Sequence, residues 1–493
     1  MLLHDLLIDA VAHAAETPAV VTESESVTFA ALLARVERRA AQIASMTARG
    51  DRVAVLAENC IEYVELYYAV PLAGRVLVPL NHRLHPHEWR ATLSTSGATA
   101  LFGEQPLLER CAAPLDHVIS FDLPPDPAPF VTPPAVNAPQ VTNAAEIAWL
   151  IGTSGTTGSP KLAMLAHSNL LAAVDATLPA RTVGPDDTLL TPFPLCHVAG
   201  YNVFVLHRRA RPIVLQRSFD PVGLAQMVRN HRVTMLSLAP TMIAMLLDHP
   251  DVEDGDLATV RALGYGASPI PGPILRRVIE RWNWDCSQGF GMTELAGNAL
   301  FLGPEDHRTA AAGDARLLTA AGRPSPGVDV RLGADDELLV RAPQVMHGYW
   351  NDPDATAVAL ADGWLHTGDV ARIDDDGLVS IVDRKKDVIV SGGENVASRE
   401  VEEVLHAHPA VRDVAVIGLP DERWGERVCA VVVTSEPVEA DVLIAHCRER
   451  LAGFKTPRRV EFADTLPRNA GGKVLKHVLR SKFGGTSGLG DAE

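Results

Sequence analysis

The sequence predicts an α/β protein whose large first part consists of layered, mainly parallel sheets. Strand-like and helix-like segments alternate through the first 282 residues, which favours parallel strands joined by helices. After Val328, short strands joined by Gly/Asp turns indicate a small antiparallel β subdomain. The texture changes again at Asp383-Arg-Lys-Lys-Asp387, and the remainder reads as a small α+β domain. We therefore expect an N-terminal domain over residues 1–385 and a C-terminal domain over residues 386–493.

Short apolar runs and helical spacing define the expected elements of the large domain. Strands are expected at 52–57, 75–80, 147–151, 188–192, 212–216, 233–238 and 260–264. Helices are expected at 29–44, 168–178, 222–230 and 273–282. The proline-rich stretch from Pro124 to Pro139 predicts a surface linker.

The same criteria apply to the rest of the chain. The antiparallel subdomain is expected to contain strands at 329–332, 337–341 and 378–382. The C-terminal domain is expected to contain a helix at 399–407, strands at 411–417 and 428–434, a helix at 439–451, a strand at 459–462 and a last helix. Only residues 484–493 have the composition of a disordered tail.

Composition narrows the class of protein. The chain has 493 residues, 47% of them hydrophobic and 21% charged, which is ordinary for a soluble globular protein of two or three domains. A formal charge of −17 gives no electrostatic reason to bind nucleic acid or anionic lipid. The six cysteines show no zinc spacing and suit a reducing compartment. Without a signal peptide or an apolar run long enough for a transmembrane helix, the cytoplasm is the expected location.

The stretch from Thr153 to Lys161, Thr-Ser-Gly-Thr-Thr-Gly-Ser-Pro-Lys, follows an apolar run that reads as a buried strand. Such a loop has little bulk, many free backbone N–H groups and one lysine, which suits the phosphates of a nucleotide. It is not the Walker pattern, and a plain surface turn is the alternative. The residues expected to bind the nucleotide here are Thr153, Ser154, Gly155, Thr156, Thr157, Gly158 and Lys161.

A second motif, Gln288-Gly-Phe-Gly-Met-Thr-Glu294, places an aromatic ring between two glycines, where it can lie flat against a base. Thr293 offers a hydroxyl to phosphate, and Glu294 offers a carboxylate to Mg²⁺. Upstream, the strand end Gly264-Tyr-Gly-Ala-Ser268 suits the other face of adenine. The alternative is a strand that turns through a glycine bend. The expected nucleotide-binding residues are Gly266, Ala267, Ser268, Gly289, Phe290, Gly291, Met292 and Thr293.

Three polar residues complete the set. Asp369 ends a Thr-Gly-Asp turn, where it caps the turn or accepts both ribose hydroxyls. Arg384 presents a planar fork to ribose or phosphate, whereas the next residue, Lys385, reads as solvated. Lys473 follows two glycines and precedes a helix, so it is either exposed or carried into a cleft by a mobile loop.

Taken in order and spacing, these motifs resemble those of the AMP-forming adenylating enzymes, the superfamily of acyl-CoA synthetases, peptide-synthetase adenylation domains and firefly-type luciferases. The N-terminal segment Val27-Thr-Phe-Ala-Ala-Leu32 fits the usual opening of that superfamily. The resemblance covers nearly the whole chain. It implies ATP, Mg²⁺ and coenzyme A as co-substrates and a small mobile C-terminal domain.

The resemblance also implies two half-reactions: a carboxylate attacks the α-phosphate of MgATP, and a thiol then displaces AMP. Lys473 is assigned to bridge the carboxylate and the α-phosphate, with Glu294 on magnesium and Thr293 and His197 as further catalytic residues. Lys386 is the hinge candidate for a rotation between the steps. The rotation would bring the thiol-channel residues to the site; these are Ser391, Gly392, Gly393 and Glu394.

The acid pocket implied by the resemblance is lined by His197, Val198, Ala199, Gly200 and Tyr201. His197 is either a gate beside the carboxylate or a satisfied core histidine. No Asp or Glu stands between Leu189 and Phe219, which counts against amino-acid substrates. The small apolar residues favour a fatty or aryl acid. The arginines at 208, 209 and 211 either pair with a second carboxylate or are exposed.

Alternatives exist for the thiol that accepts the acyl group and for whether the protein is an active enzyme. Ligases that load carrier proteins usually carry an insertion for which 493 residues leave little room, so coenzyme A is the favoured thiol. A carrier-protein phosphopantetheine is the alternative acceptor, and a non-catalytic nucleotide-binding relative is the second alternative. Luciferase-type oxidation is the least favoured reading. A homodimer is left open.

Overall fold

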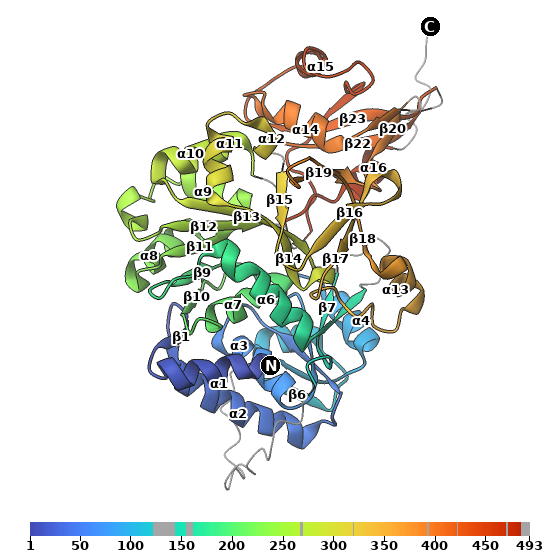
Figure 1. Ribbon diagram of the computed structural model, residues 1–493. Helices are drawn as coiled ribbons and strands as arrows, with labels where there is room; N and C mark the ends of the chain where they lie inside the picture. Colours follow the sequence, from blue (N-terminus) through green and yellow to red (C-terminus); the bar gives the residue numbers. More distant parts are fainter. Residues whose placement is uncertain are drawn as a thin grey trace. The chain divides into compact units, whose positions relative to one another are not determined.

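The computed structural model describes residues 1–121, 143–153, 161–266, 270–318, 320–391, 394–421, 423–469 and 472–484 (Figure 1). The chain forms two compact units. Unit 1 contains Met1–Val330 and Val340–Leu365, and unit 2 contains Arg331–Leu339 and His366–Glu493. The boundary that we predicted at residue 386 stays a prediction.

The first sheet of unit 1 has six strands in the order β6-β5-β3-β4-β7-β8. Five are parallel, and β8 runs antiparallel to β7. Their bounds are β3 Arg52–Leu56, β4 Val76–Pro79, β5 Ala98–Gly103, β6 His117–Ser120, β7 Ile147–Gly152 and β8 Leu162–Ala166. The strands predicted at 52–57, 75–80 and 147–151 are confirmed as β3, β4 and β7.

Within unit 1 the second sheet has the order β15-β14-β13-β12-β11-β9-β10-β1-β2. The strands expected at 188–192, 212–216, 233–238 and 260–264 are confirmed as its parallel centre. The bounds are β1 Pro18–Val21, β2 Ser26–Thr28, β9 Leu189–Thr191, β10 Ile213–Leu215, β11 Met235–Leu238, β12 Ala262–Gly266, β13 Asp285–Met292, β14 Gly297–Leu302 and β15 Ala320–Pro324. The predicted fold of layered, largely parallel sheets is therefore present.

Helix α6 (His167–Arg181) packs against β8 of one sheet and β14 of the other, so it lies between the two sheets of unit 1 (green in Figure 1). The other helices of this unit are α1 Leu3–Ala14, α2 Phe29–Met46, α3 Ile61–Leu72, α4 Pro86–Ser96, α5 Gln105–Cys111, α7 Asn202–His207, α8 Pro221–His231, α9 Pro240–Asp248, α10 Gly272–Trp282, α11 Pro304–Ala311, α12 Ala315–Leu318 and α13 Pro353–Ala359. The four predicted helices are confirmed as α2, α6, α8 and α10. Helix α3 was missed because it is buried on all sides and shows no amphipathic stripe.

Unit 2 contains a β hairpin and a second sheet. In the hairpin, β18 (Leu365–Ile373) pairs antiparallel with β19 (Val379–Arg384). The second sheet has the order β21-β20-β23-β22, with β24 beside β23. Its elements are β20 Ile389–Ser391, β21 Glu394–Val396, α14 Ser398–His406, β22 Val411–Asp421, β23 Gly425–Thr434, α15 Ala440–Arg448, β24 Arg459–Phe462 and α16 Lys476–Phe483. They confirm the predicted C-terminal elements, as β16 (Asp329–Leu332) and β17 (Glu337–Arg341) confirm the strands expected before them.

A buried polar network ties the hairpin of unit 2 to its helices. The carboxylate of Asp383 on β19 accepts hydrogen bonds from the Ser398 backbone N–H at 2.5 Å and from its hydroxyl at 2.6 Å. Lys476 on α16 donates to the same hydroxyl at 2.5 Å and pairs with Glu402 at 2.8 Å. The two bonds from Ser398 to Asp383 join residues on both sides of Lys386, so a rotation at that residue has to break them, whereas the contacts of Lys476 lie entirely after it.

Two expectations fall outside the described residues. The proline-rich linker at 124–139 belongs to the stretch 122–142, and all but the first residue of the predicted tail belongs to 485–493. Among the helices that the structure describes, none combines the length and the apolar character that crossing a membrane requires.

Candidate active site

The predicted phosphate loop begins and ends on two paired strands. Thr153 follows β7, Lys161 precedes β8, and the Thr153 N–H donates to the Lys161 carbonyl at 2.8 Å. Residues 154–160, with the predicted Ser154, Gly155, Thr156, Thr157 and Gly158, lie outside the described part of the chain. The two described ends place the loop at the carboxyl end of a parallel strand, the edge at which ligands bind in open α/β sheets.

Lys161 and Glu294 meet around one tyrosine. The Lys161 ammonium lies 5.1 Å from the centroid of the Tyr349 ring, and the Tyr349 hydroxyl donates to Glu294 Oε1 at 2.8 Å. Backbone bonds hold the three residues in place: Met346 N–H donates to the Glu294 carbonyl and Met164 N–H to the Gly348 carbonyl, each at 2.9 Å. The predicted phosphate lysine and the predicted magnesium carboxylate are therefore brought together.

Glu294 fits a magnesium ion that shares its ligands with phosphate. Its side chain is buried, and the Tyr349 hydroxyl engages only one of its two oxygens. Burial and the Glu294 carboxylate raise the pKa of Tyr349, which keeps the hydroxyl protonated as a donor. No group of three or more His, Cys, Asp or Glu among the described residues could hold a metal. One carboxylate suffices for Mg²⁺, which keeps waters and binds substrate phosphates.

The predicted adenine segments lie on neighbouring strands. Gly266 at the end of β12 pairs with Gly289 on β13, while Phe290, Met292 and Thr293 are half-buried; Ala267 and Ser268 lie outside the described residues. A Cβ on Gly289 would lie 2.3 Å from Asn298 Nδ2, and one on Gly291 would lie 1.9 Å from the Gly297 carbonyl oxygen. These glycines are thus required by the close approach of β14, a packing reason that the sequence did not show.

The predicted acid-pocket segment forms a short 3-10 helix, Val198–Tyr201, that begins after His197. Burial and the nearby Arg83 and His82 lower the pKa of His197 to about 4, so its imidazole is neutral at pH 7. Its Nε2 is buried and has no hydrogen-bond partner among the described residues. That disfavours a satisfied core histidine.

The other pocket residues are small or closely packed. Val198 and Ala199 are half-buried, and Gly200 is buried. A Cβ on Gly200 would lie 1.9 Å from the Tyr67 hydroxyl oxygen, so no larger residue fits there. Tyr201 is 1% exposed. The segment therefore presents apolar surface beside one neutral imidazole.

The other charged residues predicted for the site, Asp369, Arg384 and Lys473, lie in unit 2. Asp369 and Arg384 stand opposite each other on β18 and β19, with Arg384 Nε 2.7 Å from Asp369 Oδ1. Asp369 is 3% exposed, and its Oδ2 has no hydrogen-bond partner among the described residues. Burial raises the pKa of Asp369, while Arg384 and Lys473 oppose the rise. A buried carboxylate oxygen without a donor fits a pair of ribose hydroxyls.

The charges of Asp369 and Arg384 act on the nearby Lys473. Burial of the ammonium, followed by the cations Arg384 and Lys386, lowers the pKa of Lys473 to about 8, and Asp369 opposes the shift. More than a third of Lys473 is exposed to solvent, so the cations Arg384 and Lys386 contribute to the lowered pKa beside the burial of the ammonium. The amine is still mostly charged at pH 7.

The hinge and thiol-channel candidates follow in the same unit. Lys386 lies in the turn between β19 and β20, and it is exposed. Ser391 is buried at the end of β20 and pairs with the exposed Glu394 on β21; Gly392 and Gly393 lie outside the described residues. Their functional roles stay predictions.

Sequence reasoning did not single out Tyr349. Its only signal is a glycine before an aromatic pair, Gly348-Tyr349-Trp350, which is too common to interpret alone. Its position becomes evident only when the segment after Gln344 packs between β8 and Glu294.

Known proteins with similar sequences and structures identify the family of this chain. The model of the AMP-binding enzyme family matches residues 7–350, and that of the AMP-binding enzyme C-terminal domain matches residues 400–473. The chain belongs to the AMP-binding enzyme family. It is an AMP-forming acid–thiol ligase, as predicted, and the predicted co-substrates ATP, Mg²⁺ and coenzyme A are those of this class of ligase.

Three relatives illustrate the range. Feruloyl-CoA synthase of Amycolatopsis is 38% identical over 483 residues, covering 93% of this chain and 94% of the relative. The fatty acid–[acyl-carrier-protein] ligase ScoC of Streptomyces coeruleorubidus is 36% identical, covering 96% and 95%. The o-succinylbenzoate CoA synthetase MenE of Bacillus subtilis, solved with its acyl-adenylate intermediate, matches with a TM-score of 0.82 at 30% identity, covering 99% and 98%.

The bond between Tyr349 and Glu294 generates the first prediction. We expect Tyr349→Phe to raise the Mg²⁺ concentration for half-maximal adenylation by about 10- to 100-fold, because the carboxylate loses the donor that orients it. Titration of MgCl₂ at fixed ATP in a pyrophosphate-exchange assay measures this. Unchanged magnesium dependence in a folded variant would show that the tyrosine does not act through Glu294.

The second prediction follows from the lowered pKa of Lys473. The ammonium is charged below its pKa and loses its charge as pH rises through about 8. We expect kcat/KM of adenylation, which reports on the free enzyme, to fall above about pH 8. Lys473→Arg should move this falling limb to higher pH, because a guanidinium stays charged. A limb at the same pH in both proteins would assign it to another group.

Proposed function

We propose that this protein activates an apolar carboxylic acid, fatty or aryl, with ATP and transfers the acyl group to coenzyme A. The segment that supports an apolar acid contains small residues, Val198, Ala199 and Gly200, beside a neutral His197. A neutral imidazole beside the reacting carboxyl group donates one hydrogen bond without adding a competing cation.

The observation that carries the nucleotide assignment is the buried Asp369 with one oxygen paired to Arg384 and the other unpartnered among the described residues. Two ribose hydroxyls would supply the missing donors. We assign Lys161 and the loop before it to the outer phosphates and Glu294 to magnesium. Lys473 is assigned to the carboxylate and α-phosphate, where two anions must be brought together and fixed positive charge lowers the barrier.

Coenzyme A is the proposed acceptor, in keeping with the relatives named as CoA ligases. The one named as an acyl-carrier-protein ligase keeps a carrier-bound phosphopantetheine as the alternative. A non-catalytic nucleotide-binding role is disfavoured because Lys161, Glu294 and Lys473 are all present. The proposed compartment is the cytoplasm, which the six free thiols support.

A panel of acids tests the proposed substrate class. We expect ATP–pyrophosphate exchange with fatty or aryl acids and none with the corresponding α-amino acids, since the pocket segment offers no carboxylate to an ammonium group. Thioester formation with the best acid is then compared between coenzyme A and a phosphopantetheinylated carrier protein. Absence of exchange with every acid would favour the non-catalytic alternative.

The assigned role of Lys473 predicts an asymmetric defect. Lys473→Ala should reduce adenylation by about 10²- to 10³-fold, the effect of removing one preorganised charge. It should spare thioester formation from synthetic acyl-AMP. Lys385→Ala is the control, because Lys385 is an exposed lysine paired with Asp335 at 3.0 Å. Equal losses in both assays would refute the assignment.

A further inference from the structure

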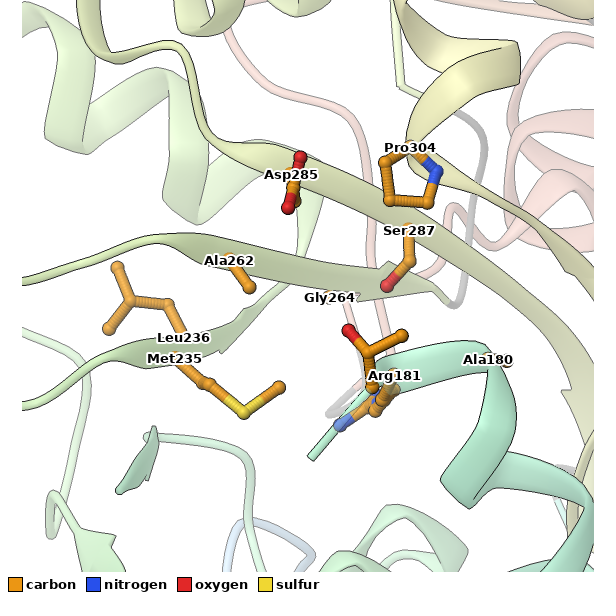
Figure 2. Close-up of a pocket in the computed structure, with 10 residues that line it drawn as sticks. Ala180, Arg181, Met235, Leu236, Ala262, Gly264, Asp285, Ser287 and Pro304 are labelled. Atoms are coloured by element: carbon orange, nitrogen blue, oxygen red, sulfur yellow. The ribbon is translucent and has the colours of Figure 1, made fainter. Parts of the chain in front are cut away.

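Arg181 is a buried cation that has no role in the site described so far. It is the last residue of α6, and only 8% of its surface is exposed. Its guanidinium lies face-on against the backbone of β12: a Cβ on Gly264 would lie 3.2 Å from Cζ and Nη2 and 3.4 Å from Nε. Figure 2 shows Arg181 between the end of α6 and the strands that carry Gly264 and Ser287.

The Arg181 guanidinium forms no ion pair among the described residues, and the carboxylate of Asp285, which lines the same cavity, is paired with Arg308. Arg181 Nη1 is buried without a hydrogen-bond partner among the described residues, and burial lowers the pKa of Arg181 while only the Tyr201 hydroxyl opposes the shift. A guanidinium offers donors and no acceptor, and it stays charged. A buried ion without a partner destabilises the folded protein. The described residues therefore supply no acceptor for Arg181 Nη1.

Three polar side chains near Arg181, those of Thr177, Tyr201 and Asn298, are hydrogen-bonded to one another. Thr177, one helical turn earlier on α6, donates to the Ala173 carbonyl at 2.8 Å and accepts from the Tyr201 hydroxyl at 2.9 Å. Tyr201 in turn accepts from Asn298 Nδ2 at 3.2 Å. Because Tyr201 belongs to the predicted acid pocket, this chain of hydrogen bonds joins the pocket to the helix face that carries Arg181.

The strands beneath these side chains place Arg181 and Asn298 on one face of the sheet. Gly264 pairs with Ser287, and Gly266 pairs with Gly289, over which Asn298 lies. Residues two apart on a strand share a face, so Arg181 and Asn298 cover the same side of β12 and β13. Gly264 and Gly266 are about 7 Å apart along the strand. A benzene ring with a short substituent spans such a distance.

We propose that Arg181 binds an anionic oxygen group, in the simplest case a second carboxylate, at the tail of the acid substrate. A carboxylate matches the planar fork with two parallel hydrogen bonds. The cavity beside Arg181, about 10 Å³, has room for about one water, which the tail group would displace. Its lining also includes Asp285, whose carboxylate is paired with Arg308. The inference rests on the proposed function and refines it: the acid is apolar in its middle and charged at both ends.

Three other arginines were considered from the sequence as partners of a second substrate carboxylate. Arg208 and Arg209 are exposed, and Arg208 lies 3.7 Å from Asp175. Arg211 donates to the carbonyl of Ala210 at 2.8 Å and to that of Pro185. Their interactions are thus with the protein itself, in keeping with the reading that they do not bind substrate.

Matched acids test the proposal. Pyrophosphate exchange is measured with pairs of acids that share one skeleton and end in either a methyl group or a carboxylate. The wild-type protein should prefer the diacid. Arg181→Met should lower kcat/KM for the diacid by about 10- to 100-fold, the loss of one charge-assisted contact, and leave the monoacid unchanged or improved. Arg208→Met, the matched control, should change neither.

Two further measurements separate binding from a structural role. Arg181→Met should leave the melting temperature of the unliganded protein unchanged or raise it, because an unpaired buried charge is removed. Gly264→Ala keeps the charge but displaces the guanidinium, and it should reproduce the loss for the diacid. Equal losses for both acids, or a lower melting temperature in Arg181→Met, would overturn the proposal.

Failure of this inference differs from failure of the proposed function. If monoacids support exchange, and Arg181→Met changes the rates for neither member of a pair, Arg181 takes no part in substrate choice and the ligase assignment stands. If no acid supports exchange in the wild-type protein, the proposed function itself fails.

Discussion

Charge buried without enough partners is the constraint on which the candidate site depends. Asp369 is nearly inaccessible, yet one of its oxygens has no donor among the described residues. The opposing Arg384 and the nearby Lys473 compensate part of the cost, while burial and the cations Arg384 and Lys386 lower the pKa of Lys473. A fold that retains such groups gives up stability, which is reasonable where a ligand completes the hydrogen bonding.

Both units contain charged side chains that are held in place by neighbouring residues. In unit 1, the Tyr349 hydroxyl donates to Glu294 and the Tyr349 ring lies under the Lys161 ammonium, so one side chain contacts two groups of opposite charge. In unit 2, the β18–β19 hairpin fixes Asp369 against Arg384. Each unit thus holds part of the candidate site on regular secondary structure, which keeps charged side chains in defined positions.

The network around Asp383 and Ser398 bears on motion in unit 2. Two short hydrogen bonds from Ser398 to one buried carboxylate, together with Lys476 and Glu402, join β19 to the helices after it. A rotation at Lys386 has to break the two hydrogen bonds from Ser398 to Asp383, because these join residues on either side of it. The polar network therefore sets the energetic scale of any domain rotation at that point.

The sequence by itself determined the alternation of strands and helices, the family and the order of the motifs, because these depend on local periodicity and on residue types at fixed spacing. It could not reveal α3, whose apolar surface faces the core on all sides, or Tyr349, which reaches Glu294 from 55 positions away. It also attributed Gly289 and Gly291 to ligand approach, where the packing of β14 already requires them. Only the tertiary structure showed that Arg181 is buried with no partner for its Nη1 among the described residues, since burial and pairing depend on residues distant in sequence.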